Sequence, residues 1–575
     1  MGKKGIFKTD FGSEQPRLDP EALFRDLKER APEIKHLWSH QADILREYYN
    51  QYANTKDIAI ELPTGTGKTL VGLLIAEFRR RTFNERVAYL CPTKQLAKQV
   101  TTQAIQYGIK GFTFVGKQRD YDASEFSEYQ AGQAIAITNY SSVFNTRPRI
   151  HDAHTLILDD AHASENYLTS MWSVEISRLE SNTLYDAILD LYKPALSEAF
   201  VASLSKDSPD HYHNVDVVPG QSFRSSVQTL RDILDSQLDE DDSAWYAWHT
   251  IKQHLPACNM FIGGKSILLR PTIPPTLSHA PFCNANQRVY MSATLGAGGE
   301  LERITGIKHI ERIPMPSGWD KRGSGRRLFL LPQVVLDEDH AQAILIDATK
   351  QMARSLVLVP SQTEARVLRD ILRDSDVTVI GAGEIEDSID VFGKSTGISL
   401  ILSRYDGLDL PDDTCRLLVF GGLPAGINLQ ERFYLARLAA SSMLRDRILT
   451  RFTQGVGRCT RSDNDYAVVI LYGKALVDFI LKVENRRILH PELQAEIEFG
   501  IENSKDKNPK EFAELWKVFL QRDEAWTEAE KAITGLREAK IHHSDPTVDR
   551  LRLVVADEVE YQYALWRGDY DLALE

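Results

Sequence analysis

Short apolar runs recur along this chain at intervals that a helix would fill. In the first part of the chain they cover residues 57–61, 86–92, 133–139, 154–162 and, after a long gap, 287–291. Runs without polar alternation predict strands buried on both faces, and helices between them predict a parallel sheet. A second series covers residues 327–331, 355–359, 377–380, 397–402, 416–420 and 466–471. The pattern therefore predicts an α/β protein with two parallel-sheet domains.

Segments that break this pattern give the expected domain boundaries. Residues 172–204 and 225–255 have mainly helical periodicity, so we predict a helical domain inserted between the fourth and fifth strands. The expected division is a lead-in at 1–35, domain 1 at 36–165 completed by 286–315, the insertion at 166–285, domain 2 at 325–485, and a helical extension at 486–575. The basic stretch 321–327 is interpreted as a solvated hinge. We expect the insertion or the charged extension to offer a docking surface to a protein partner.

The stretch Glu61–Thr69, with the sequence ELPTGTGKT, joins the first predicted strand to a helix. Strand, glycine-rich turn and helix N-terminus together present backbone N–H groups that can hold a triphosphate. Leu62 stands where the first glycine of the usual pattern lies, and the alternative is a simple strand-to-helix turn with a surface lysine. We favour an ATP site, in which Lys68 lies along the β- and γ-phosphates and Thr69 ligates Mg²⁺. The candidate binding residues are Thr64, Gly65, Thr66, Gly67, Lys68 and Thr69.

Two further candidates flank this stretch in the first domain. Asp159 and Asp160 end an apolar run, at the sheet edge where ligands of parallel sheets bind. One carboxylate is suited to hold Mg²⁺ and the other to polarise an attacking water, whereas the alternative is a solvated pair or a helix cap. Gln41 precedes the first strand and could read an adenine edge with its amide, or be an ordinary surface glutamine.

The second domain has no glycine-rich loop of this kind, but it contains the segment QGVGRCTR at 454–461. Arg458 and Arg461 are three residues apart and so share one helical face. They could reach across an interdomain cleft to a γ-phosphate, where such an arginine can contribute about 10³–10⁵ in rate. The alternative is a solvated helix face.

Composition narrows the class of protein. The net charge of −13 weighs against a protein that coats nucleic acid, although a local basic groove remains compatible with it. Five scattered cysteines without C-x-x-C spacing argue against a disulfide framework, a structural zinc site or an iron–sulfur cluster. The chain has no apolar run of about 18 residues and no signal peptide after Met1. We therefore expect a cytoplasmic protein without a membrane segment.

Taken in order, six segments resemble superfamily 2 helicases of the DEAD/DEAH type, and within them the XPD/DinG-like branch. They are PTGTGKT, PTKQLAKQ, DDAH, SAT, SRYDGLDLPDD and QGVGRCTR. The resemblance implies two RecA-like domains that close on ATP and Mg²⁺ while a single strand, DNA rather than RNA, crosses both. Its implied catalytic residues are Lys68, Asp159, Asp160 as general base, Gln454, Arg458 and Arg461, with Mg²⁺ at Thr69 and Asp159. It also implies nucleic-acid contacts at Thr93, Lys94, Thr138, Asn139, Ser361 and Gly407, and a nucleotide contact at Asp409.

Two departures from that family bear on the expected activity. Asp160 stands where the family usually has Glu, so the carboxylate is one methylene shorter, and a displacement near 1 Å can cost about 10²-fold in rate. Residues 101–158 hold no cysteine, so we expect no iron–sulfur cluster. We expect an ATP-dependent single-strand translocase and DNA helicase that moves 5′→3′. The alternatives are a nucleotide-gated clamp with slow hydrolysis and an RNA-directed remodeller.

Overall fold

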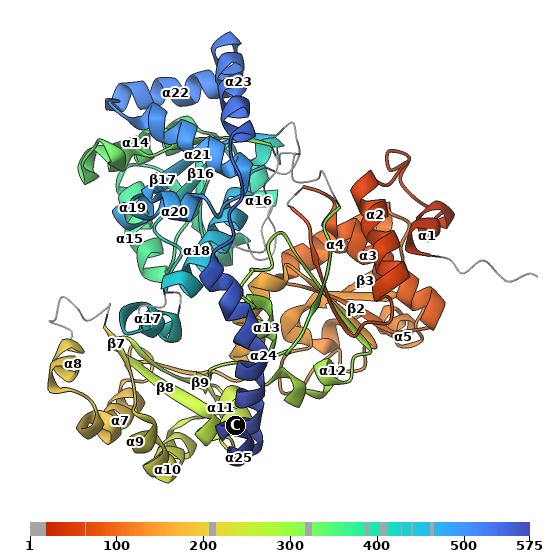
Figure 1. Cartoon of the computed structure of the whole chain (residues 1–575), viewed down its shortest axis with the longest axis vertical. Helices are drawn as coiled ribbons and strands as arrows, with labels where there is room; N and C mark the ends of the chain where they lie inside the picture. The colour runs from red at the N-terminus through yellow and green to blue at the C-terminus, as the bar shows by residue number, and fades with distance from the viewer. Residues whose placement is uncertain are drawn as a thin grey trace, which may run out of the picture.

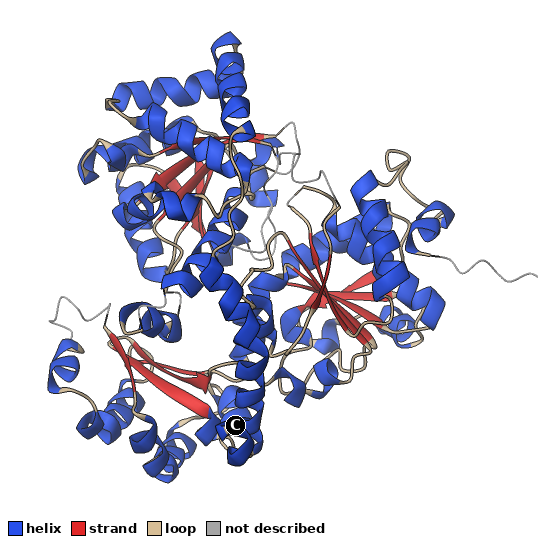
Figure 2. Ribbon diagram, in the orientation of Figure 1, coloured by secondary structure: helices blue, strands red, loops and turns tan. Residues whose placement is uncertain are grey.

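Three sheets, each with its own helices, make up the molecule (Figures 1 and 2). The computed structural model describes residues 19–63, 65–205, 214–316, 325–385, 390–402, 410, 412–426, 428–438, 441–460 and 465–575. We call residues 19–170 with 276–313 lobe 1, residues 174–271 the inserted domain, and residues 326–538 lobe 2. The lead-in 1–18, the candidates Thr64, Gly407, Asp409 and Arg461, and most of the expected hinge lie outside the described residues.

Lobe 1 is built on a seven-stranded parallel sheet in the order β11-β1-β10-β5-β2-β4-β3. Its strands are β1 (Asp57–Glu61), β2 (Val87–Cys91), β3 (Gly111–Phe114), β4 (Ile135–Asn139), β5 (Thr155–Asp159), β10 (Gln287–Ser292) and β11 (Glu311–Ile313). Its helices are α1 (Pro20–Asp26), α2 (Ser39–Glu47), α3 (Lys68–Phe83), α4 (Lys94–Gln106), α5 (Ala123–Gln130), α6 (Glu165–Ser170), α12 (Ala280–Cys283) and α13 (Glu300–Thr305). The five strands predicted for this domain are confirmed, whereas the short β3 and β11 were not predicted.

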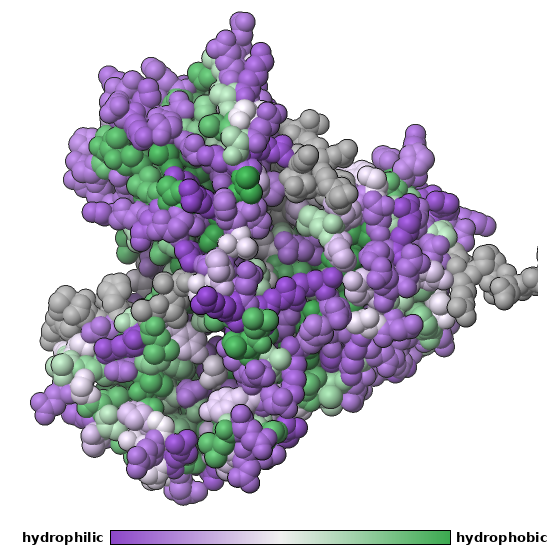
Figure 3. Space-filling view, in the orientation of Figure 1, coloured by the Kyte–Doolittle hydropathy of each residue, from purple (hydrophilic) through white to green (hydrophobic). Residues whose placement is uncertain are grey.

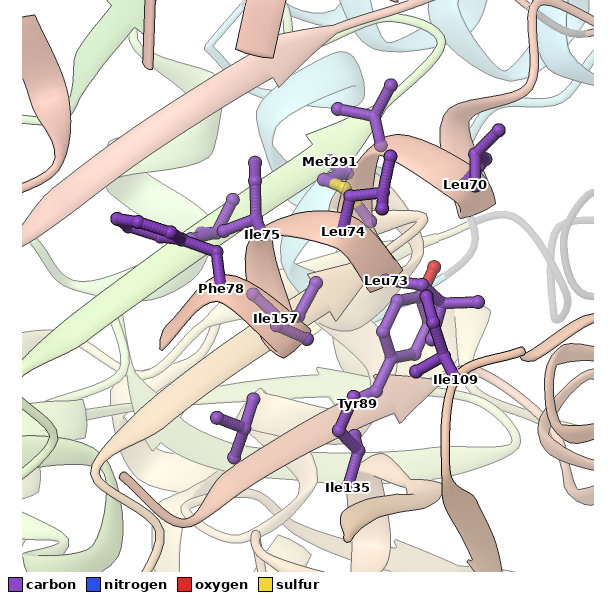
Figure 4. Packing of buried hydrophobic residues seen from close by; sticks show 14 of the residues in the cluster. Leu70, Leu73, Leu74, Ile75, Phe78, Tyr89, Ile109, Ile135, Ile157 and Met291 are labelled. Carbon is purple, nitrogen blue, oxygen red and sulfur yellow. The ribbon is translucent and has the colours of Figure 1, made fainter. Parts of the chain in front are cut away.

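Helix α3 is held on the sheet by an almost entirely apolar surface (Figure 4). Leu73, Leu74 and Phe78 of this helix lie in one buried cluster with Tyr89 of β2 and Met291 of β10. Each such side chain contributes about 1.5–3 kcal/mol on full burial. Because α3 is fixed on the sheet from Leu70 onward, its N-terminus stays at the carboxyl edge of β1, where the glycine-rich turn enters it.

The inserted domain leaves lobe 1 after β5 and returns at β10, and these two strands are neighbours in the sheet. It contains an antiparallel sheet in the order β6-β9-β8-β7, which the prediction of a mainly helical domain did not include. Its strands are β6 (Val174–Ser177), β7 (Val215–Val217), β8 (Cys258–Gly263) and β9 (Ser266–Pro271). Its helices are α7 (Asn182–Tyr192), α8 (Glu198–Ser203), α9 (Gly220–Ser225), α10 (Val227–Gln237) and α11 (Trp245–Ile251). The helices of this domain have apolar side chains that are buried against the sheet, where they pack with Ile267 and Leu269 of β9.

Lobe 2 has a six-stranded parallel sheet in the order β12-β17-β16-β13-β15-β14, and all six predicted strands are confirmed. They are β12 (Arg326–Leu330), β13 (Arg354–Leu358), β14 (Thr378–Gly381), β15 (Ile398–Leu402), β16 (Leu417–Gly421) and β17 (Tyr466–Tyr472). Its helices are α14 (Glu338–Gln351), α15 (Gln362–Asp374), α16 (Asp390–Lys394), α17 (Leu429–Ala436), α18 (Ser441–Val456), α19 (Lys474–Leu481) and α20 (Val483–Arg486).

Five helices make up the C-terminal part of the chain, and the first three complete the core of lobe 2. They are α21 (Pro491–Ser504), α22 (Pro509–Gln521), α23 (Glu524–Glu538), α24 (Pro546–Arg567) and α25 (Tyr570–Leu574). Ile497 of α21 is buried on one face of the sheet, and Phe512 and Trp516 of α22 are buried on the other. The apolar sides of α21 and α22 are therefore covered within the chain, whereas Leu553, Tyr561 and Leu574 of the last two helices are exposed. The expected docking surface on this segment stays a prediction.

Helix α24 runs from lobe 2 past α13 to the inserted domain (Figure 1). The Asp545 carboxylate at its start pairs with Arg445 of α18, and Glu558 pairs with Arg303 of α13 at 2.6 Å. At its end the Trp566 ring stacks on His254 with 4.0 Å between ring centroids. A single helix thus joins all three bodies.

The visible face of the molecule is mostly hydrophilic, with hydrophobic side chains gathered in separate patches (Figure 3). Among the described residues, no helix is both long enough and apolar enough to cross a bilayer.

Candidate nucleotide site

The loop before α3 has the backbone of an anion cradle. Gly65 and Gly67 have φ angles of 80° and 76°, in the left-handed region that side chains rarely occupy. A Cβ at Gly67 would lie 2.2 Å from the Gln41 Nε2 atom, so this position requires glycine for space as well. The 16-residue α3 begins at Lys68, and Thr69 lies half-buried in its first turn. The N–H groups of that turn have no partner within the helix and are suited to phosphate oxygens.

The side chain of Gln41 supports this loop from behind. Its Nε2 donates to the Thr66 carbonyl at 3.0 Å, and its Oε1 accepts from the Trp38 N–H at 3.0 Å. The His40 Nε2 atom lies 2.8 Å from the same Thr66 carbonyl. Gln41 is buried, so its amide is engaged with the protein here, and the expected adenine contact stays a prediction.

Asp159 and Asp160 lie at the end of β5, opposite the loop. The Lys68 Nζ atom is 2.6 Å from the Asp160 Oδ1 atom and 3.8 Å from the Asp159 Oδ1 atom. Tyr89 donates to the Asp159 carboxylate at 2.9 Å, and Tyr140 donates to its carbonyl at 2.8 Å. Asp160 has a left-handed φ of 48°, which turns its carboxylate toward Lys68 and costs about 1 kcal/mol or more.

The two carboxyl groups titrate in opposite directions. Burial raises the pKa of Asp159 above its ordinary value. Burial also acts on Asp160, but the charges of Lys68 and Arg458 outweigh it and hold its pKa far below the ordinary value. The Asp160 carboxylate therefore stays ionised, and the Asp159 carboxylate is more readily protonated. A further cation beside Asp159 would favour its ionised form.

Helix α18 and the turn that follows it bring the second lobe to this site through Gln454 and Arg458. The Arg458 Nη2 atom lies 3.7 Å from the Asp160 Oδ2 atom, so Asp160 stands between Lys68 of lobe 1 and Arg458 of lobe 2. The Gln454 Nε2 atom donates to the Thr294 hydroxyl at 2.8 Å. Both residues face lobe 1, and their predicted contact with a γ-phosphate stays a prediction.

Three residues that the candidate set omitted link these parts. The His162 Nδ1 atom lies 2.6 Å from the Ser292 hydroxyl, and Ser292 Oγ accepts from the Thr294 N–H at 3.2 Å. Thr294 in turn accepts from Gln454. Burial lowers the pKa of His162 to about 3, so its ring is neutral, and its buried Nε2 has no partner among the described residues. A continuous chain of polar contacts thus runs from β5 through the SAT segment to lobe 2.

A second interlobe contact lies one to two turns before Gln454 in α18. The Arg447 guanidinium pairs with Glu300 at 2.5 Å, with Glu165 at 3.3 Å and with Glu431 at 3.0 Å. Arg451 pairs with Glu431 at 2.6 Å. Burial would raise the pKa of Glu431, but the two arginines outweigh it and lower that pKa to about 2. The positions 447, 451, 454 and 458 share one helical face, a spacing that could have revealed this contact from the sequence.

The expected nucleic-acid contacts do not all reach the surface. Thr93 and Ser361 are N-caps of α4 and α15, and Lys94 is exposed. Asn139 is half-buried and donates to Ser141. The Thr138 side chain is fully buried and its hydroxyl donates to the Phe114 carbonyl, so the expected contact of this side chain with nucleic acid is not available in this structure.

The donor set fits a nucleotide with its metal. A glycine cradle, a lysine and a helix N-terminus suit phosphate, and a carboxylate beside a hydroxyl suits Mg²⁺, which prefers oxygen ligands. The buried Nε2 of His162 leaves one further polar atom in the same place for a ligand or water.

Two family models match the chain. The DEAD/DEAH box helicase model matches residues 38–184, which include the glycine-rich loop and Asp159, and the helicase C-terminal domain model matches residues 345–478, which include α18. The chain carries the two domains of a superfamily 2 helicase of the DEAD/DEAH type. The glycine-rich loop and Asp160 lie in the first matched region, and Gln454 and Arg458 lie in the second. The family resemblance noted in the sequence is thereby confirmed, and the fold has the two predicted parallel-sheet domains.

Individual relatives are distant. The ATP-dependent DNA helicase Hel308 of Thermococcus kodakarensis is 25% identical over 149 residues, which are 26% of this chain and 13% of that protein. The match therefore spans far less than two thirds of that relative. Among solved structures, S. tokodaii Xpd4 has a TM-score of 0.46 at 16% identity, covering 78% of this chain and 99% of that one. A structure described as an XPD helicase has a TM-score of 0.49 at 17% identity, covering 76% and 96%.

Proposed function

We propose that this helicase-family chain is an ATP-driven translocase on single-stranded nucleic acid. The observation that carries the proposal is the position of Asp160, 2.6 Å from Lys68 of lobe 1 and within 3.7 Å of Arg458 of lobe 2. A phosphate bound on the loop would be contacted from both lobes, so ATP binding and hydrolysis would alter how tightly the lobes hold together. In this proposal, the alternation between tight and loose contact of the two lobes moves the chain along the nucleic-acid strand.

In this proposal each residue has a separate task. Lys68 releases Asp160 and binds the β- and γ-phosphates, which leaves the Asp160 carboxylate free to accept a proton from the attacking water. Thr69 and Asp159 hold Mg²⁺, which offsets phosphate charge when it is bound. Arg458 stabilises the charge that develops on the γ-phosphate, and Arg461 is proposed as a second arginine for the same task. Gln454 holds α18 beside Thr294 through its hydrogen bond while Lys68 and Arg458 move from Asp160 to the phosphates.

The test measures ATP turnover with and without single-stranded DNA for the wild type, Lys68→Ala and Arg458→Ala. We expect the strand to stimulate the wild type strongly and both variants to lose turnover. Turnover by the wild type that does not respond to DNA or to RNA contradicts the proposal.

The proposal has two finer features, namely the kind of nucleic acid that is bound and the direction of movement along it. The family resemblance favours DNA over RNA and movement 5′→3′, with duplex unwinding where the inserted domain meets the fork. Competition between DNA and RNA strands of equal length tests the first. Unwinding of duplexes with a single 5′ or 3′ overhang tests the second, and a preference for the 3′ overhang contradicts it.

A second candidate is a nucleotide-gated clamp that hydrolyses ATP slowly. It is favoured by the engagement of Asp160 with two cations and by its shorter side chain compared with the usual Glu. A clamp gains turnover in Asp160→Glu by about 10-fold or more, since the longer side chain restores the reach of the base. A translocase already turns over quickly as the wild type and gains little.

A further inference from the structure

A cavity of about 590 Å³ lies where lobe 1, lobe 2, the inserted domain and α24 meet. Glu165 contributes from lobe 1, Tyr434 from α17, Arg270 from β9 and Tyr561 from α24. None of the proposed ATP-site residues lines it. Its volume is within the range of small-molecule sites, about 300–1,000 Å³.

Arg270 lies in the wall of this cavity, and its charged side chain is buried. Strand β9 places Leu268 and Arg270 on the face that packs against Leu429 of α17, away from the helices of the inserted domain. Arg270 is 5% exposed, yet no carboxylate in the described part of the chain lies within 4.0 Å of it. Its one hydrogen bond is from Nε to the Pro271 carbonyl, at 3.4 Å. Burial lowers its pKa, as expected for a charge that has lost water without gaining a counter-ion.

The other two arginines of the cavity wall are paired with carboxylates. Arg303 pairs with Glu558 at 2.6 Å, and Arg447 pairs with carboxylates of both lobes. The cavity lining holds four carboxylates and three guanidiniums, namely Glu165, Glu431, Asp557, Glu558, Arg270, Arg303 and Arg447. A strand with one phosphate per nucleotide would meet an acidic wall here, whereas a ligand with a single anionic group would meet one unpaired cation.

The rest of the wall is apolar. Ile273 and Ile304 are buried on it, and Tyr434 adds an aromatic ring with a hydroxyl. From this arrangement we infer that the cavity is a binding site for a small organic anion, with one carboxylate or phosphate group on Arg270 and an apolar or aromatic body against Ile273 and Ile304. Because Arg447 and Glu165 of the interlobe contact also line the cavity, such a ligand acts on the closure of the two lobes. The inference does not depend on the proposed motor activity.

The test uses 1-anilinonaphthalene-8-sulfonate, a fluorescent organic monoanion, with full-length protein. We expect one site per chain, and at least a tenfold increase of Kd in Arg270→Met, which replaces the side chain with a shorter, unbranched and uncharged one. The exposed Arg224 of the same domain provides the matched control, since Arg224→Met leaves the Kd unchanged. Lys68→Ala also leaves it unchanged, which separates this site from the ATP site. Displacement by phenyl phosphate or by phenylacetate identifies which anionic group is preferred.

The neutral analogue N-phenyl-1-naphthylamine provides a second test on the wild type alone, which does not depend on whether Arg270→Met folds. It should bind the wild type at least tenfold more weakly than the sulfonate. Arg270→Met should unfold at the same temperature as the wild type or higher, because it removes a buried charge without a counter-ion. The inference is overturned if wild type binds no sulfonate, if it binds the neutral analogue equally well, or if Arg270→Met retains the wild-type Kd.

Discussion

The Arg458 guanidinium of lobe 2 lies 3.7 Å from the Asp160 carboxylate of lobe 1, and Asp160 is at the same time bound by Lys68. The second lobe is therefore already in contact with the catalytic edge of the first sheet. Arg458 needs only to exchange one anion, a carboxylate, for another, a phosphate.

Arg458→Ala should lower kcat for ATP by about 10³-fold or more, since an arginine that contacts a transferring phosphate contributes that much. Nucleotide affinity should change only a few-fold, because Lys68 and the glycine-rich loop remain. Turnover assays and titration with a fluorescent ATP analogue measure the two quantities. Arg373→Ala, on the exposed side of α15, is the control and should match the wild type. An equal loss of kcat and of affinity in Arg458→Ala contradicts the assigned task.

Gly67→Ala should abolish nucleotide binding. The added Cβ would meet the Gln41 amide at 2.2 Å in a backbone conformation that alanine disfavours. Gly116→Ala is the matched control, because Gly116 has a φ of 84° but open space around its Cβ position, so it carries the backbone cost alone of about 1 kcal/mol. Removing the clash with Gln41→Ala should restore part of the binding to Gly67→Ala. No difference between the two glycine variants in nucleotide titrations would show that the cradle tolerates the methyl group.

Asp446→Asn should stabilise the protein at neutral pH. Burial, with Glu300 nearby, raises the pKa of Asp446 to about 6, against about 3.9 in the unfolded chain. The folded protein thus takes up a proton between pH 6 and 4 that the unfolded chain lacks, so acidification relieves a penalty that is complete above pH 6 and on the order of 3 kcal/mol. Melting curves should show a higher Tm for the variant at pH 7.5 and no difference below about pH 4. The exposed Asp374→Asn should have no effect at either pH.

Glu431→Gln should have the opposite dependence. Its pKa of about 2 in the folded protein lies below the unfolded value of about 4.3, so the ionised carboxylate stabilises the protein above pH 4.3 and this contribution is lost as the pH falls toward 2. The variant leaves Arg447 and Arg451 short of a buried counter-charge, which costs about 3–5 kcal/mol at neutral pH. Thermal unfolding at pH 7.5 and pH 3 measures both limits. A loss of equal size at the two pH values would mean that packing, not charge, holds Glu431.

Trp566→Ala should destabilise the inserted domain by about 3–5 kcal/mol, the cost of emptying a buried tryptophan site. The Trp566 ring is 7% exposed and belongs to the core of that domain. Leu553→Ala, on the same helix but 80% exposed, should change the stability by no more than about 0.5 kcal/mol. Hydrogen exchange of β8 and β9 should rise in the first variant alone. If the amides of β8 and β9 remain protected from exchange in Trp566→Ala, the end of α24 does not stabilise the core of the inserted domain.

Local pattern was enough to predict the parallel strands, the glycine-rich loop, Asp159 and the helix with Arg458, because each depends on residues close in sequence. The sheet of the inserted domain was missed although Gly264-Lys265 between β8 and β9 is typical of a tight hairpin. Its other strands, β6 and β7, are only four and three residues long and give little periodicity. The contacts of His162 with Ser292 and of Thr294 with Gln454 join residues 130 and 160 positions apart, and no spacing rule predicts such pairs.

The His254 Nδ1 atom lies 2.7 Å from the Trp566 carbonyl oxygen at the end of α24, 312 residues later in the chain. A ribosome that adds about 5–20 residues per second needs about 15–60 s to make that interval. For this time the nascent inserted domain has its strands and helices but not the tryptophan that finishes its interior. The interior of the inserted domain is thus completed only after α24 has been synthesised.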